Sequence, residues 1–130
     1  MLLGYGAKNC WCFKDWLDIN LRLNGYVPKD VSDNRDYSLI LGFEGANASG
    51  KTSALKVFAF IADFIKNSFI YTPESLILYD SFFNNNEPSE FYVEFTDSDE
   101  LEYRYEAILQ KDHVIKETLF LIKSTVEEIL

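Results

Sequence analysis

The segment Gly45–Thr52, which reads GANASGKT, constrains this chain more than any other feature of its 130 residues. It fits the pattern G-x-x-x-x-G-K-[S/T], in which a glycine-rich loop joins a strand to a helix and holds phosphate groups. From ordinary amino-acid frequencies, a chance match in a chain of this size occurs in about a few cases per thousand. The motif therefore predicts a strand, a phosphate-binding loop and a helix, in that order.

The sequence on either side of the loop has the character that the motif needs. Tyr37–Phe43 is an unbroken apolar run, which is typical of a strand covered on both faces. From Gly50 to about Ser68, apolar residues recur at helical spacing, and so many are apolar that the helix must be largely covered. The expected stripe consists of Leu55, Phe58, Ala62 and Ile65, broadened by Val57, Ile61 and Phe64.

Each residue type in the loop has a physical reason. Gly45 and Gly50 permit unusual backbone angles and a close approach of phosphate oxygens. The free amides and the dipole of the helix N-terminus attract an anion. Lys51 would reach the β- and γ-phosphates, and the Thr52 hydroxyl would bind Mg²⁺. The predicted ligands are ATP and Mg²⁺, and the predicted nucleotide-binding residues are Gly45, Ala46, Asn47, Ala48, Ser49, Gly50, Lys51, Thr52 and Ser53.

The remaining sequence predicts mainly antiparallel strands. Leu2–Phe13 is rich in apolar and aromatic residues, and the alternating segment Trp16–Leu23 follows it closely, so we expect the two to pair. Three further alternating segments, Phe91–Phe95, Leu101–Leu109 and Val114–Ile122, are separated by hairpin-sized connections. They predict a three-stranded meander.

Two long segments and the last residues carry other signals. Asn24–Asp36 and most of Tyr71–Pro88 contain proline, asparagine and charged residues and are predicted as loops. Ser124–Leu130 begins with hydroxyl side chains that are followed three residues later by carboxylates. This capping-box pattern predicts the start of a helix.

Composition limits the class of protein. A chain of 130 residues with 48% hydrophobic residues is expected to form one domain with a core. Its net charge of −9 and the lack of a basic cluster argue against direct binding of nucleic acid by this segment. The start of the chain does not resemble a signal peptide, and Ala54–Phe69 is too charged and short to cross a bilayer. We expect a cytoplasmic protein without a membrane partner.

The two cysteines indicate a reduced protein. Cys10 and Cys12 would lie on one face of the first predicted strand, and two cysteines are too few for a disulfide framework. Zinc would need further Cys or His ligands, and His113 is the only histidine. His113 and the acidic stretch Asp97–Glu102 are expected in solvated turns.

Hydrolysis needs parts that the sequence does not clearly supply. A second apolar strand should end in a carboxylate that binds Mg²⁺, the Walker B element. Leu76–Asp80 offers one candidate, but Asp80 is followed by Ser81 rather than Glu, and a surface acid is the more ordinary interpretation. The catalytic residues therefore stay unknown, and the 130-residue chain by itself is expected to show weak or no turnover.

Several segments together resemble one family. This chain resembles the ABC-type ATPases of the SMC, RecF and OLD-like group in several segments. They are LILGFEGANASGKTSALK, the opening KNCWCFKD (Lys8–Asp15) and the strands EPSEFYVEF, YRYEAIL and IKETLFL. The closest likeness is to bacterial AAA-type ATPases of abortive-infection and other anti-phage systems. The resemblance implies an α/β fold, the N-terminal lobe of a P-loop NTPase, with a P-loop strand and helix plus an antiparallel β-meander. It also implies that Asn47 lies near the γ-phosphate.

The resemblance frames two hypotheses. In the first, residues 1–130 are the N-terminal part of an ATPase domain and do not make up the whole domain. They pair with a second ATPase head or with the remainder of the domain. ATP hydrolysis by the complete ATPase then switches an effector in anti-phage defence. The signature helix, the Walker B Asp-Glu pair and the switch histidine of such proteins come later in their chains. In the alternative, the chain is a stand-alone module that complements or interferes with a partner ATPase. A small kinase-like enzyme that uses Asp80 is the third interpretation.

Overall fold

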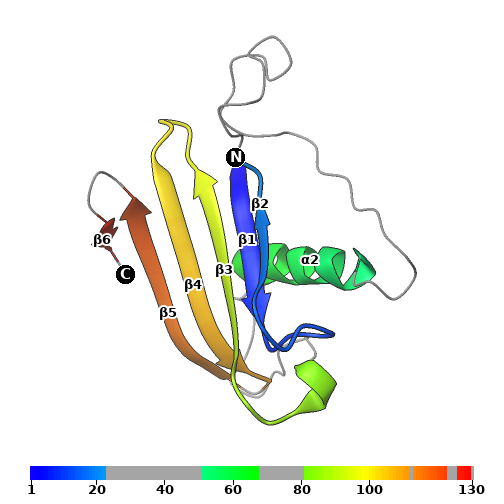
Figure 1. The fold of residues 1–130 in the computed structure, drawn as a ribbon. Helices are drawn as coiled ribbons and strands as arrows, with labels where there is room; N and C mark the ends of the chain where they lie inside the picture. The colour runs from blue at the N-terminus through cyan, green and yellow to red at the C-terminus, as the bar shows by residue number, and fades with distance from the viewer. Residues whose placement is uncertain (23–50, 68–80, 112, 123–125, 130) are drawn as a thin grey trace.

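The computed structural model describes residues 1–22, 51–67, 81–111, 113–122 and 126–129. In these residues the chain forms one antiparallel sheet of six strands in the order β2-β1-β3-β4-β5-β6, and a helix lies across one face beside β1 (Figure 1). The strands are β1 Leu2–Lys8, β2 Leu17–Asn20, β3 Ser89–Thr96, β4 Glu102–Gln110, β5 His113–Ile122 and β6 Val126–Glu128. The helices are α2 Lys51–Asn67 and the short 3₁₀ helix η2 Phe82–Asn84.

The first two strands pair antiparallel, which confirms the prediction from their spacing. The register runs from Gly4 opposite Asn20 to Ala7 opposite Leu17. Along β2, half-buried and exposed side chains alternate, as expected for a strand with one face on the core.

The predicted length of the first strand was wrong, because β1 ends at Lys8 rather than at Phe13. Asn9 and Trp11 have φ angles of 57° and 48°, in the left-handed region, so the chain turns instead of continuing extended. Backbone hydrogen bonds of 3.0 and 2.9 Å join Cys10 and Phe13 across this turn. Cys10 is therefore buried and Cys12 exposed, and the expectation that both lie on one strand face was also wrong.

This turn predicts a large difference in reactivity between the two thiols. Burial raises the pKa of the Cys10 thiol to about 12, whereas Cys12 is exposed. Because the thiolate is the nucleophile, we expect iodoacetamide near pH 8 to alkylate Cys12 at least about 100-fold faster than Cys10 in the native protein. Peptide mass spectrometry over a time course measures both rates. In denaturant the two rates should converge, and equal rates in the native protein would contradict the described turn.

The predicted meander is confirmed. β3 pairs with β4 from Ser89 opposite Leu109 to Thr96 opposite Glu102, and β4 pairs with β5 with one irregularity after Ile108. Since directly opposed residues share a face, the register places an apolar group of side chains on the side of α2. This group comprises Tyr5, Ala7, Phe91, Val93, Tyr105, Ala107 and Leu109.

The predicted C-terminal helix was wrong. Val126–Glu128 forms β6 and pairs antiparallel with the end of β5, with Val126 opposite Ile122. The Ile129 amide extends the ladder by donating to the Leu119 carbonyl at 2.9 Å. An isolated helix shorter than about 12 residues is marginal in water, whereas the edge of β5 already offers backbone partners. Pairing with β5 therefore prevails over the local capping pattern.

The helix predicted for residues 50–68 is observed as α2 over Lys51–Asn67, and of its expected apolar stripe only the three residues that broaden it are buried. Val57, Ile61 and Phe64 pack into the core, together with Ala54 and Phe60. The central residues of the expected stripe are exposed instead: Leu55 by 52%, Ile65 by 47% and Phe58 by 38%. Ala62 is exposed as well.

Contacts between aromatic rings of α2 and β3 explain which face of the helix is buried. More than half of the circumference of α2 is apolar, so helical periodicity alone cannot tell which part meets the strands. The rings of Phe60 and Phe64 contact the Phe91 ring edge-on, with centroids 5.7 and 5.5 Å apart. Such edge-to-face contacts add to the burial of apolar area and select this orientation of the helix.

Several predictions fall outside the described residues. They are the apolar strand Tyr37–Phe43, the loops Asn24–Asp36 and Tyr71–Asp80, and the candidate Walker B run Leu76–Asp80. The part of the predicted loop from Ser81 to Pro88 is described and contains η2.

Candidate functional site

The phosphate-binding motif meets the described structure at the start of α2. Gly45, Ala46, Asn47, Ala48, Ser49 and Gly50 lie outside the described residues. Lys51 is the first residue of α2, Thr52 is exposed in its first turn, and Ser53 is half-buried. The described part of the helix therefore includes Lys51, Thr52 and Ser53 of the motif.

The first turn of α2 has the electrostatic character of an anion site. The first amides of an α-helix have no carbonyl partner within the helix, and the helix dipole adds a partial positive charge there. The first turn of α2 holds no acidic residue, and Lys66 lies in the last turn. No carboxylate of this turn would therefore oppose an anion bound there.

Tyr5 of β1 fixes the first turn to the sheet. Its hydroxyl donates a hydrogen bond of 3.0 Å to the Ala54 carbonyl, and its ring lies 5.2 Å from the Phe58 ring. Burial raises the pKa of the Tyr5 hydroxyl, so it stays a donor at neutral pH. Sequence reasoning did not single out Tyr5 as a positioning residue, although it lies between Leu3 and Ala7 on the alternating apolar face of β1.

A polar clasp holds the turn after β1 to the segment before β3. The Asn9 amide nitrogen lies 3.0 Å from Asn85 Oδ1 and 3.1 Å from the carbonyls of Glu87 and Pro88. The Asn85 amide nitrogen in return donates to Asn9 Oδ1 at 2.7 Å, and the Ser89 hydroxyl donates to the Asn9 carbonyl. These bonds explain why Asn9 is buried despite its polarity.

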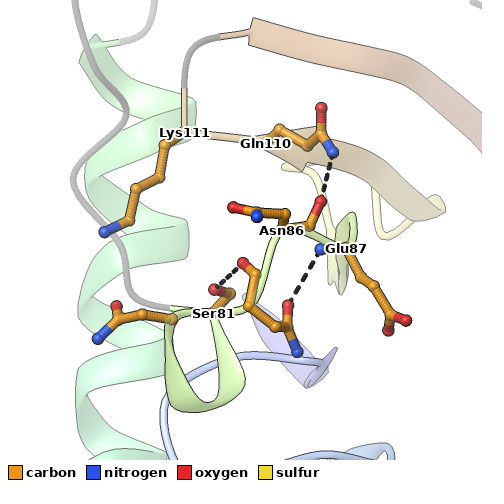
Figure 2. Close-up of a pocket in the computed structure, with 7 residues that line it drawn as sticks. Ser81, Asn86, Glu87, Gln110 and Lys111 are labelled. Atoms are coloured by element: carbon orange, nitrogen blue, oxygen red, sulfur yellow. Dashed lines mark hydrogen bonds between the residues drawn. The ribbon is translucent and has the colours of Figure 1, made fainter.

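A hollow of about 430 Å³ lies next to this clasp, and Figure 2 shows its lining. It is lined by Ser81, Asn84, Asn85, Asn86, Glu87, Gln110 and Lys111. Its polar groups largely bind one another: Ser81 Oγ donates to the Asn85 carbonyl at 2.8 Å, and Gln110 Nε2 donates to the Asn86 carbonyl at 2.9 Å (Figure 2). Among the described residues that line the hollow, none belongs to the motif.

The remaining candidate residues do not form a catalytic or metal centre in the described part of the chain. His113 is exposed as expected, but it is the first residue of β5 and not a turn residue, so its predicted place in the turn was wrong. Asp97 accepts hydrogen bonds from the Asp99 and Leu101 amides and organises the β3–β4 turn, which lowers the pKa of its carboxyl. Among the described residues, no group of three or more His, Cys, Asp or Glu side chains could hold a metal ion.

Comparison with known families identifies the class of protein. One family model matches residues 40–129, which is more than half of the chain. The family is described as an AAA domain related to the AbiEii toxin of type IV toxin–antitoxin (TA) systems. The chain belongs to this AAA domain family, a P-loop ATPase-like family. No curated protein and no solved structure gives a significant match.

The family match agrees with the broader expectations from the sequence. It supports a P-loop ATPase-like family and is compatible with nucleotide binding, and such domains in general use a nucleotide and Mg²⁺. The described fold combines an antiparallel sheet with α2, in line with the expected α/β class. No helix in the described residues is long and apolar enough to span a membrane.

Proposed function

We propose that the chain binds Mg-ATP through Gly45–Thr52, as the N-terminal part of an ABC-type ATPase of the SMC, RecF and OLD-like group. The observation that carries the proposal is that the end of the motif is helical, because α2 contains both Lys51 and Thr52 and the motif predicts a helix there. Membership of an AAA domain family supports it independently.

Each residue of the loop has a role in this proposal. The amides of residues 45–50 and the side chain of Lys51 hold the phosphates, and Ser53 closes the end of the site. Thr52 would bind the magnesium ion through its hydroxyl, since its side chain is exposed in the first turn of α2. Mg²⁺ would neutralise charge between the β- and γ-phosphates. Asn47 would lie beside the γ-phosphate.

Further protein must complete the site for efficient hydrolysis. The exposed apolar stripe on α2, formed by Leu55, Phe58, Ala62 and Ile65, supports this view, because soluble proteins usually cover a contiguous apolar surface of this kind. A second ATPase head or the remainder of the domain would supply the Walker B carboxylate and the group that positions water. The complete ATPase would then switch an effector, with anti-phage defence as its setting.

The same stripe supports a second candidate function. In that case the chain is a stand-alone nucleotide-binding module, and the stripe is the surface that joins a partner ATPase. The length of the native reading frame distinguishes the two. A stop codon directly after Leu130, followed by a gene with Walker B and signature motifs, would favour the module, whereas a continuing frame would favour the single ATPase.

A calorimetric titration with Mg²⁺ and a non-hydrolysable ATP analogue tests the binding site. We expect the wild-type chain to bind and Lys51→Ala to weaken binding by roughly 10- to 100-fold, since a hydrogen bond to a charged group contributes about 1.5–3 kcal/mol. Lys56→Ala is the matched control, because Lys56 is exposed on α2 beyond its first turn. The same affinity for wild type and Lys51→Ala would refute the proposed site.

Phosphate release provides a separate test of turnover. The 130-residue chain should release phosphate from Mg-ATP weakly or not at all, since the sequence supplies no clear second acid and no water-positioning group. Strong phosphate release by the wild-type chain, abolished by Lys51→Ala, would overturn this expectation. The proposal that the chain binds Mg-ATP would still stand.

A further inference from the structure

The hydroxyl of Tyr5 links the sheet to α2 directly after the motif. It donates a hydrogen bond of 3.0 Å to the carbonyl of Ala54, which follows Ser53 along the helix. Tyr5 is 3% exposed and Ala54 is 4% exposed, and a hydrogen bond in such a buried place is electrostatically stronger than in water. A carbonyl oxygen has two lone pairs, so that of Ala54 can accept from Tyr5 in addition to its bond within the helix.

Tyr5 is itself held firmly, because its strand has a neighbour on both sides. Within the sheet it lies opposite Ile19 of β2 and opposite Val93 of β3. Its ring lies 5.2 Å from the ring of Phe58, about one helical turn after Ala54. The hydroxyl therefore reaches the helix from an ordered part of the sheet.

This hydrogen bond constrains α2 in a way that the packing of rings does not. The contacts of Phe60 and Phe64 with Phe91 select the buried face of the helix. Apolar attraction is non-directional, however, and tolerates small shifts of the helix along its axis. A hydrogen bond weakens steeply when its distance or angle changes. The bond from Tyr5 to Ala54 therefore sets the position of α2 along its own axis.

We propose that Tyr5 is a positioning residue for phosphate binding, because its hydroxyl holds the motif end of α2 where Lys51 and Thr52 can meet the phosphates. This inference rests on the proposed function, since it concerns the same nucleotide site. The amides at the N-terminal end of a helix point along its axis toward a bound anion. A shift of α2 along its axis therefore changes their distance from a phosphate directly. Tyr5 acts through Ala54 and not through the ligand.

Calorimetry with Mg²⁺ and a non-hydrolysable ATP analogue tests this role, and Mg²⁺ with tripolyphosphate serves as a second probe that has no base. Tyr5→Phe keeps the ring and removes the hydroxyl, and we expect it to weaken the binding of both probes by the same factor, about three- to tenfold. Tyr5→Met, which fills the space with neither ring nor hydroxyl, should weaken binding at least as much. Tyr105→Phe is the matched control and should bind like the wild type, because the Tyr105 hydroxyl donates to Glu117 of β5 at 2.8 Å rather than to α2.

The titrations use a temperature at which melting curves show every variant to be fully folded, so that lower stability alone leaves the measured affinity unchanged. Equal affinity of the wild type and Tyr5→Phe would overturn the positioning role, and the proposal that the chain binds Mg-ATP would still stand. Equal weakening by Tyr5→Phe and Tyr105→Phe, or a loss seen with the ATP analogue but not with tripolyphosphate, would overturn the positioning role as well. Absence of binding by the wild type would refute the proposed function and this inference with it.

Discussion

Replacing Gly6 with alanine is expected to lower the free energy of unfolding by roughly 3 kcal/mol or more. A Cβ atom at Gly6 would lie 2.3 Å from Tyr92 Cε1 and 2.4 Å from the Leu17 carbonyl oxygen. Neither neighbour can move away easily. The Tyr92 ring is held between Trp16 and Arg104, and Leu17 belongs to the ladder between β1 and β2.

Urea denaturation followed by circular dichroism measures the effect of Gly6→Ala. Gly4→Ala is a graded comparison, because a Cβ there would meet one backbone atom, the Ile19 carbonyl oxygen, at 2.8 Å. We expect it to destabilise less. The double variant Gly6→Ala/Tyr92→Ala should lose less free energy of unfolding than the sum of the two single variants, because the clash with the Tyr92 ring is gone. The clash with the Leu17 carbonyl oxygen stays, so the effect of Gly6→Ala is only partly relieved. A Gly6→Ala protein as stable as the wild type would contradict the described packing of the tyrosine on β1.

Phe64→Ala is the second change with a large expected effect, a loss of about 3–5 kcal/mol in the free energy of unfolding. The Phe64 side chain is 1% exposed and lies 5.5 Å from the Phe91 ring and 5.8 Å from the Phe60 ring. Its removal leaves a cavity between α2 and the sheet that rigid strands cannot close. The same urea experiment measures the loss.

The neighbouring residue supplies the matched control. Ile65 is 47% exposed on the same helix, so Ile65→Ala should change the free energy of unfolding by less than about 1 kcal/mol. This contrast tests the described orientation of α2, since the stripe expected from the sequence contained both Ile65 at its centre and Phe64 at its broadened side. If Ile65→Ala destabilised the chain as much as Phe64→Ala, the orientation of the helix described here would be wrong.

Local patterns were sufficient for the strands of the meander and for the existence of α2. β3, β4 and β5 alternate strongly and are joined by short connections, so their antiparallel pairing follows from neighbouring residues alone. The turn at Asn9 was missed because its backbone angle depends on a distant partner. Asn85, 76 positions away, exchanges amide hydrogen bonds with Asn9 and holds it in the left-handed region.

For the candidate site, the motif could be recognised in the sequence, whereas the contacts that hold α2 to the sheet are visible only in the structure. Gly45, Gly50, Lys51 and Thr52 follow a spacing that predicts a helix after the loop, and α2 contains Lys51 and Thr52. The hydrogen bond from Tyr5 to Ala54 could not be predicted, because it joins residues 49 positions apart whose relation depends on how the helix crosses the sheet.

The sequence by itself determined which segments alternate, which segment is helical and where the phosphate-binding motif lies, because these depend on residues a few positions apart. The tertiary structure decided three other points. It selected the face of α2 that is buried, it turned Val126–Glu128 into a strand on the edge of β5, and it brought Trp16, Tyr92 and Arg104 together. Each of these depends on contacts between distant segments, for which local periodicity carries no information.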